Sequence, residues 1–371
     1  MSLAPRPLRV LTWHVHGNYL YYLSQIPHEL HLVTLPGDPP GHAGRVGSLP
    51  WGANVHEVRA DELNGREFDC VLYQSKRDFD EDRLRYLSPA QRSLPAIYLE
   101  HDPPQQHPTE TRHWAAGLVD MLVHVTPFNA LMWDSGQTPV RVIEHGVLVP
   151  DGIRYSGRLA RGIVVVNHLR RRGRRLGLDV FEFARERVPL TLVGMDSESL
   201  GGDGEIPNLE LPATMAAYRF FFNPIRYTSL GLAVVEAMAI GMPIVGLATT
   251  ELPTVIRNEV NGYVDTRPQR LVEAMNALIH DPDTARRAGF PRPILHGLAT
   301  FGVVGHALLR SVCGYDPEVF HKMSVRFTAP VYPGETIRTE IWRDGSRCAF
   351  QARVVERDVL VIGNGRFELR H

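Results

Sequence analysis

The sequence predicts an α/β protein with two parallel β-sheets in tandem, followed by a smaller α+β segment. Three observations support this fold class. Short apolar runs alternate with helical patterns through the first 285 residues, as expected of repeated β–α units. A polar lead-in at 158–161, followed by the apolar run 162–167, restarts this alternation. Beyond residue 285 the pattern changes to one long apolar helix and then a series of strands.

Ten strands and three main helices are expected before the tail. The strands lie at residues 9–13, 29–34, 70–74, 96–100, 121–125, 141–144, 162–167, 190–194, 220–223 and 243–247, and the helices at 177–187, 230–240 and 270–279. The Pro- and Gly-rich stretch 36–50 predicts a mobile loop. We divide the chain into an N-terminal Rossmann-like lobe (1–150), a second lobe (151–285) and a tail (286–371). Ligands of such sheets collect at the carboxyl ends of the strands, here in a cleft between the lobes.

Bulk composition limits the classes of partner. Forty basic against 41 acidic side chains leave a net charge of −1, which disfavours nucleic acid and anionic membranes. No apolar run approaches the roughly 18 residues that cross a bilayer, and no signal-peptide core precedes the first strand. Three scattered cysteines predict neither a disulfide framework nor a zinc site. We therefore expect a cytoplasmic protein that requires no metal.

The segment 228–245, TSLGLAVVEAMAIGMPIV, is the most informative motif. Ser229, Leu230 and Gly231 open a helix whose unpaired N–H groups and positive dipole end can hold a phosphate. Glu236, about two turns further on, can accept hydrogen bonds from the hydroxyls of a ribose. Together with ELPTVI at 251–256 and NGYV at 261–264, this motif resembles the donor lobe of retaining GT-B glycosyltransferases, specifically the glycogen-synthase-like family 4. The resemblance covers most of residues 8–285.

This resemblance implies a retaining glycosyltransferase of the hexosyltransferase type. Such an enzyme moves a sugar from a nucleotide-diphosphate donor, its co-substrate, to an acceptor, and needs no other cofactor. The family has two Glu residues with seven between them, and Thr228 stands at the first position. Turnover and sugar choice therefore depend on a hydroxyl where the family has a carboxylate. His101 matches the family's sugar-contacting His, and Gly17 resembles its glycine-rich first loop.

A basic run, NHLRRRGRR at 167–175, follows a strand at its carboxyl end. The family places an Arg and a Lys against the donor diphosphate here, and guanidinium forks suit phosphate oxygens. We expect Arg170, Arg174 and Arg175 to bind the diphosphate. Because the spacing differs from the family's, which arginines contact phosphate stays open.

The tail carries a second resemblance. GFPRPILHGL at 289–298 and VRFTAPVYPGET at 325–336 resemble the R-specific enoyl-CoA hydratase (MaoC-like hot-dog) family. An apolar helix at 294–309 would be enclosed by strands at 322–329, 336–342, 347–356 and 359–369, and the N–H of Gly297 would polarise a thioester oxygen. Ala274 stands where the family has its catalytic Asp, and His280 lies one position late. We therefore interpret His280, His296 and Gly297 as a remnant of a hydratase site.

Three functions stay open from the sequence. The first is glycosyl transfer by the two lobes. The second is enoyl-CoA hydration through the tail. The third is non-catalytic sugar-nucleotide binding, with the partial hot-dog serving as a homodimerisation module because half a hot-dog exposes apolar surface. The two family patterns merge at 280–290, as in a domain fusion.

Overall fold

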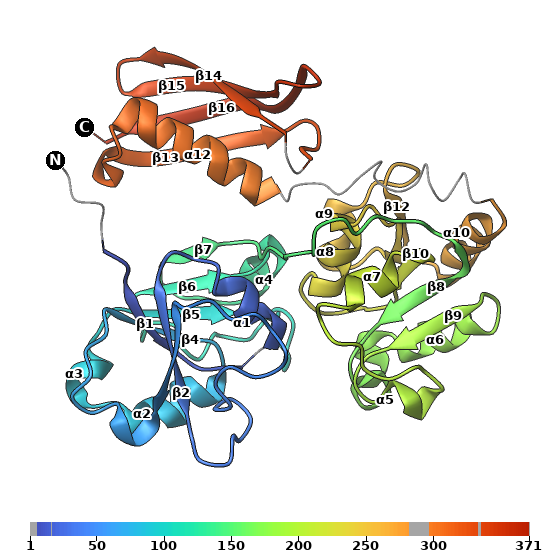
Figure 1. The fold of residues 1–371 in the computed structure, drawn as a ribbon, viewed down its shortest axis with the longest axis horizontal. Helices are drawn as coiled ribbons and strands as arrows, with labels where there is room; N and C mark the ends of the chain where they lie inside the picture. The colour runs from blue at the N-terminus through green and yellow to red at the C-terminus, as the bar shows by residue number, and fades with distance from the viewer. Residues whose placement is uncertain (1–5, 16, 282–296, 333–334, 371) are drawn as a thin grey trace.

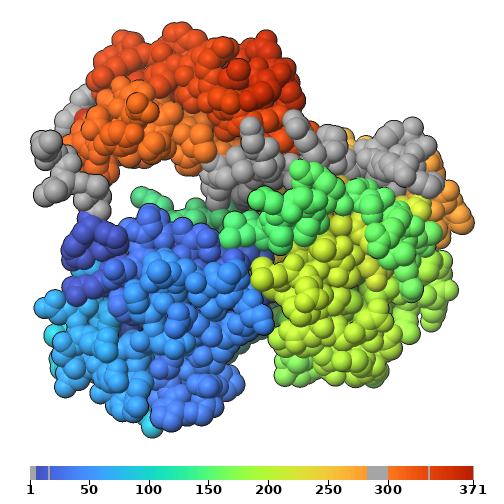
Figure 2. Space-filling view, in the orientation of Figure 1, coloured from blue at the N-terminus to red at the C-terminus, as the bar shows by residue number. Residues whose placement is uncertain are grey.

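Three β-sheets follow one another along the chain (Figure 1). The computed structural model describes residues 6–15, 17–281, 297–332 and 335–370. Figure 2 shows the first two α/β units side by side, with the tail across the top of the view. The predicted fold class, two parallel α/β units and a small α+β tail, is confirmed.

The first unit is a seven-stranded parallel sheet in the order β3-β2-β1-β4-β5-β6-β7. Alternation along β2 sends Leu30 and Leu32 into one apolar layer and Val33 into the other, so both faces of the sheet are buried. The strands are β1 (Arg9–Thr12), β2 (Glu29–Thr34), β3 (Val55–Arg59), β4 (Cys70–Tyr73), β5 (Ala96–Glu100), β6 (Met121–His124) and β7 (Val140–Val142). Since both faces are covered, polar ligand groups gather at the strand ends.

Short helices connect these strands. Ser88 and Gln91 form a reciprocal capping box at the start of α3, and Thr126 caps α4 by accepting a hydrogen bond from the Asn129 N–H at 3.1 Å. The helices are α1 (Gly17–Leu23), η1 (Ala60–Glu62), the π-helical turn η2 (Asp78–Asp82), α2 (Arg83–Tyr86), α3 (Pro89–Arg92) and α4 (Pro127–Met132). The caps fix where the chain turns back after β4 and β6.

The second unit is a five-stranded parallel sheet in the order β12-β11-β10-β8-β9. All six residues of its central strand, β10, are buried, as expected when helices cover both faces. The strands are β8 (Leu159–Val165), β9 (Leu190–Val193), β10 (Tyr218–Asn223), β11 (Ile244–Leu247) and β12 (Gly262–Asp265). The helices are α5 (Leu169–Arg172), η3 (Gly173–Leu176), α6 (Leu178–Arg185), η4 (Ser197–Leu200), α7 (Leu211–Met215), α8 (Leu232–Ala239), α9 (Leu252–Val255) and α10 (Pro268–His280).

A buried arginine ties α10 to this second unit. Arg219 in β10 donates to the carbonyls of Leu278 at 3.2 Å and Ile279 at 3.0 Å, where the helix C-terminus attracts a cation. Met275 and Leu278 are fully buried in the same apolar core. Helix α10 is therefore an integral part of the second α/β unit.

The tail is a four-stranded antiparallel sheet in the order β13-β16-β15-β14, with one helix on it. Its elements are α12 (Gly297–Cys313), η5 (Pro317–Val319), β13 (Phe320–Phe327), β14 (Ile337–Asp344), β15 (Arg347–Val354) and β16 (Val359–Leu369). Val304 and Leu308 pack on the sheet, but Val303 is 48% exposed. The expectation of an enclosed helix was wrong, because four strands cover a single face of α12.

Most predicted elements are confirmed to within a few residues. Two edge strands, β3 and β12, were not expected from the sequence. The stretch 36–50 is tied to the first unit by isolated bridges between His14 and Gly41 and between Thr34 and Ala43. Over the described ranges, no helix combines the length and apolar character that crossing a bilayer requires.

Candidate functional site

A cavity of about 420 Å³ lies where the carboxyl ends of the two parallel sheets face each other. Segments that follow β1, β5, β8, β9 and β10 supply its walls, in agreement with the rule for open parallel sheets. The polar residues lining it are Asn18, Tyr19, His101, Asp102 and His145 from the first lobe and Asn167, Arg172, Glu205, Thr228, Ser229 and Glu236 from the second. Gly194 and Gly231 also line it.

Glu236 is the most buried carboxylate of this cavity, at 1% exposure. It accepts a hydrogen bond from the Tyr22 hydroxyl at 2.6 Å and one from the Asn208 amide at 3.3 Å, while Asn208 also donates to Tyr22 at 3.1 Å. Burial raises the pKa of Glu236, and the two donors oppose this rise. Tyr22 belongs to α1 of the first lobe. The carboxylate that we expect to bind ribose, Glu236, therefore accepts a hydrogen bond from the opposite lobe.

The loop before α8 leaves room for an anion. Gly231, the N-cap of α8, is in an extended conformation without a side-chain cap, so the first N–H groups of the helix lack a capping side chain. A methyl group added at Gly231 would meet no atom within 4 Å. The predicted residues Ser229, Leu230 and Gly231 all line the cavity.

Thr228 meets a carboxylate from across the cleft. Its hydroxyl donates to Asp102 Oδ1 at 3.2 Å. The backbone around Asp102 is fixed twice: its N–H donates to Glu100 at 2.9 Å, and its carbonyl accepts from the Trp133 indole at 2.8 Å. A fixed negative group thus stands within hydrogen-bond reach of the position where the family has Glu.

His101 is held from behind by Gln74. The Gln74 amide nitrogen donates to Thr12 Oγ1 at 3.0 Å and to the Trp13 carbonyl at 3.1 Å, which leaves its oxygen facing His101 Nε2 at 3.3 Å. That arrangement assigns the proton of His101 to Nε2. Tyr19 packs edge-on against the imidazole with ring centroids 4.4 Å apart.

Two buried acids lie beneath this part of the site. Burial raises the pKa of Glu100 to about 8 and that of Asp78 to about 7. His113 lies 3.1 Å from Glu100, and burial lowers the pKa of His113 to about 4. Because Glu100 holds the Asp102 N–H, its protonation is connected to the cavity wall.

The basic run presents a different arginine from those we expected. Arg172 lines the cavity. Its pKa is lowered mainly by burial and, to a smaller extent, by the positive charge of Arg175. Arg170 instead donates to the Ser199 carbonyl at 2.5 Å, and Arg174 pairs with Asp179 at 2.6 Å. Arg170, Arg174 and Arg175 are not among the lining residues.

Other expected residues fall at or near the cavity. Gly17 begins α1, and its neighbours Asn18 and Tyr19 line the wall. Sequence reasoning missed Tyr22 and Asn208 as partners of Glu236. No local pattern marks them, because they meet Glu236 through folding over long chain separations.

The residues expected of a hydratase site lie on separate elements. Ala274 and His280 belong to α10 of the second α/β unit, and His280 is exposed at its end. Gly297 is the first residue of α12 in the tail. His296 lies outside the described residues.

Two family models match this chain in succession. The family described as glycosyl transferases group 1 matches residues 163–281, and the MaoC like domain matches residues 273–365. Residues 273–281 fall in both matches, and residues 273–280 form the C-terminal part of α10.

Two sequence relatives each match about a quarter of this chain. The peroxisomal multifunctional enzyme type 2 of Mus musculus is 45% identical over 100 residues, which is 27% of this chain and 14% of that protein. The peroxisomal enoyl-CoA hydratase 2 of Arabidopsis thaliana is 46% identical over 93 residues, 25% of this chain and 30% of that protein. The chain therefore spans less than a third of the length of these relatives.

Solved structures share the architecture of the two lobes. Sucrose-phosphate synthase from Thermosynechococcus elongatus aligns with a TM-score of 0.56 and 16% identity over 84% of this chain and all of that one. HepE from Anabaena, solved in complex with UDP and glucose, aligns with a TM-score of 0.55 and 13% identity over 76% of this chain and 92% of that one. At these identities the likeness concerns the fold.

Proposed function

We propose that this chain, which joins a group 1 glycosyltransferase region of GT-B architecture to a C-terminal MaoC-like region, transfers a sugar from a nucleotide diphosphate with retention. The sugar-transferase fold is the starting point. The observation that carries the finer proposal is one cavity that brings together Glu236, the loop before α8 and Arg172 from one lobe with His101 and Asp102 from the other.

The parts of the cavity match the parts of a donor. Glu236 binds the ribose hydroxyls through charge-assisted hydrogen bonds. The N–H groups around Ser229 and Gly231 bind the diphosphate together with Arg172, so that cations and a helix end stabilise the leaving group. This supports binding and departure of a nucleotide diphosphate without a resident metal.

Asp102 takes the place of the carboxylate lost at Thr228. The Thr228 hydroxyl alone cannot balance the positive charge that develops on the sugar, whereas Asp102, hydrogen-bonded to it at 3.2 Å, can. His101 contacts the donor sugar from the same wall. We assign His101, Asp102 and Thr228 to the sugar end of the cavity.

The tail is assigned to assembly. Four strands cover one face of α12, and the exposed apolar side chains Val303, Phe327, Trp342 and Val355 leave surface for a second copy. Hydration is not favoured, because Ala274 and His280 serve the second α/β unit through α10.

A donor-binding screen tests the proposed function. UDP-, GDP- and ADP-glucose are titrated into the intact chain, beginning with the UDP sugar because HepE was solved with UDP and glucose. One donor should bind in a 1:1 ratio and release free sugar slowly in water. Failure of all three to bind, in a chain shown to be folded, would contradict the proposal.

A further inference from the structure

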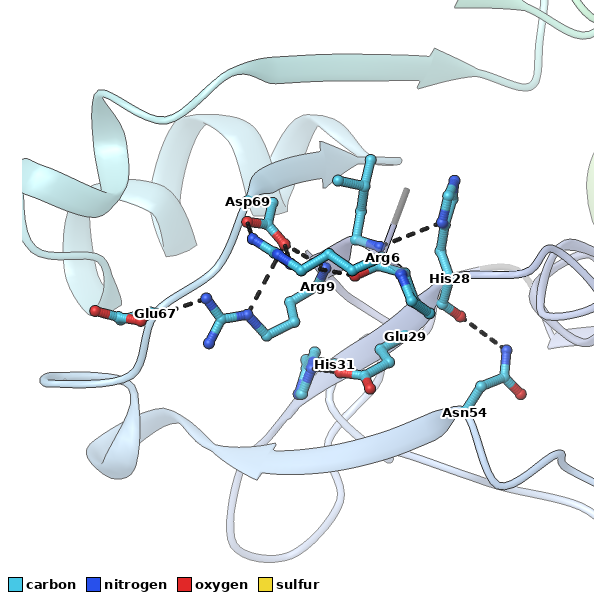
Figure 3. A network of polar contacts seen from close by, with 10 residues as sticks. Arg6, Arg9, His28, Glu29, His31, Asn54, Glu67 and Asp69 are labelled. Carbon is cyan, nitrogen blue, oxygen red and sulfur yellow. Dashed lines mark hydrogen bonds and ion pairs between the residues drawn. The ribbon is translucent and has the colours of Figure 1, made fainter. Parts of the chain in front are cut away.

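Three potential metal ligands meet on the first sheet, away from the donor cavity. Glu29 and His31 share one face of β2 because they are two residues apart, and the parallel register places His56 of β3 directly beside His31. Glu29 begins β2, whereas the cavity lies at the carboxyl ends of the strands. Figure 3 shows the Glu29 carboxylate directed at the His31 ring. The cluster is therefore independent of the proposed transfer site.

The distances place ligand atoms around a common point. One ligand atom from each of the three residues lies within 4.8 Å of the other two. His31 Nε2 is 3.6 Å from Glu29 Oε2, and the two imidazoles stack with centroids 4.9 Å apart at an interplanar angle of 26°. Phe68 packs edge-on against His31 at 5.3 Å and limits the rotation of that ring.

The contacts of His31 are unsatisfied within the described part of the chain. Both of its ring nitrogens are buried without a hydrogen bond there, and 3.6 Å is too long for a hydrogen bond to Glu29. An imidazole with two unpartnered ring nitrogens beside a carboxylate is an arrangement of ligand atoms that suits a metal cation.

The neighbouring arginines do not serve as the cation beside Glu29 and His31. Arg6 makes two hydrogen bonds to Asp69, at 2.6 and 2.8 Å (Figure 3), and Arg66 pairs with Glu62 at 3.1 Å. Each guanidinium therefore has its own counter-charge. The charge of Glu29 remains available to an ion.

We propose that Glu29, His31 and His56 form a binding site for a divalent transition-metal ion of the Zn²⁺ type. Two imidazoles and one carboxylate suit zinc, with water as the fourth ligand. Zinc bonds of ~2.1 Å at tetrahedral angles place ligand atoms roughly 3.4 Å apart, close to the observed 3.6 Å. Small side-chain rotations would bring His56 into the sphere. The ion would cross-link β2 to β3, which lies at one edge of the sheet.

Calorimetric titration of the intact, chelator-treated protein with Zn²⁺ tests this site. We expect one tight equivalent that H56Q and E29Q each weaken by more than about tenfold, whereas H321A, at an exposed histidine of the tail, binds as the wild type does. Co²⁺ should give the visible absorption of a tetrahedral site in the wild type and not in H56Q. Mg²⁺ should not bind there, because it prefers six oxygen ligands.

Two results would overturn the proposal. One is the absence of a tight Zn²⁺ equivalent in the wild type. The other is an equivalent that H56Q and E29Q leave unchanged, which would place the zinc elsewhere. Circular dichroism and donor binding of each variant show whether it is folded, and neither readout depends on this metal.

Discussion

The second lobe and the tail both carry the sequence signature of an enzyme family, but they retain different parts of it. In the second lobe, the loop before α8 and Glu236 meet in one cavity with residues of the facing lobe. In the tail, the helix and sheet are present, whereas the segment matching the hydratase acid–base motif is folded into α10. A match to a family therefore reports the scaffold, and the site has to be checked residue by residue.

The largest expected effect is the absence of hydratase activity. General acid and base groups contribute roughly 100- to 10,000-fold each, and Ala274 and His280 supply neither at the tail. Crotonyl-CoA absorbance should fall no faster with concentrated protein than in buffer, with an authentic hydratase as positive control. A hydration rate above that of buffer, abolished by H280A, would show that the tail retains a working site as well as its scaffold.

Removal of the Asp102 charge tests whether Asp102 and Thr228 share one role at the sugar end of the cavity. D102N should lower kcat on the order of 100-fold with a smaller change in KM, because the charge acts mainly in the transition state. D151N, at an exposed aspartate, is the matched control. T228E should restore turnover in the D102N background, since it returns the carboxylate to the other side of the 3.2 Å contact. A double variant as slow as D102N would mean that the two positions do not share a role.

Glu236 should dominate nucleotide binding. E236A should weaken donor affinity by about 1.5–3 kcal/mol, the range for a hydrogen bond to a charged group. E182A, at an exposed glutamate of α6, should bind as the wild type does. Equal affinities of E236A and the wild type in titration calorimetry would remove Glu236 from the donor site.

Substitution of Tyr22 should change donor affinity in the opposite direction. Its hydroxyl occupies Glu236 at 2.6 Å, where a ribose hydroxyl would bind, so a donor has to displace it. Y22F should raise donor affinity by about two- to tenfold, equivalent to a hydrogen bond of ~0.5–1.5 kcal/mol, while Y21F should not. The gain should vanish in the E236A background. Weaker binding by Y22F would show instead that the phenol helps to hold the donor.

The smallest expected effect concerns pH. Burial raises the pKa of Glu100 to about 8, so between the ordinary pKa of a Glu and 8 the folded chain keeps a proton that the unfolded chain releases. Stability should therefore fall as the pH rises through this window. E100Q keeps an acceptor for the Asp102 N–H but cannot ionise, and should flatten the dependence of Tm on pH without removing the part due to Asp78. An unchanged slope would contradict this assignment.

Sequence patterns predicted the fold better than the site. Buried strands such as β10 can be recognised as short apolar runs, and the start of α8 can be recognised from the residues around Gly231. The edge strand β3 was missed because only Val55 and Val58 of its five residues are apolar and buried, and their spacing of three does not follow the period of two expected of a strand. The contact of Tyr22 with Glu236 depends on how the two lobes face each other, which no local pattern encodes. Arg172 was not distinguished from its neighbours because α5 and η3, not charge, decide which guanidinium turns inward.

The most direct test is calorimetric titration of the same intact protein with UDP-glucose and, separately, with crotonyl-CoA. We expect the nucleotide sugar to bind in a 1:1 ratio, E236A to weaken this binding, and crotonyl-CoA to give no saturable heat. Saturable binding of crotonyl-CoA, with no nucleotide sugar bound, would contradict the central claim that the functional site lies between the two lobes.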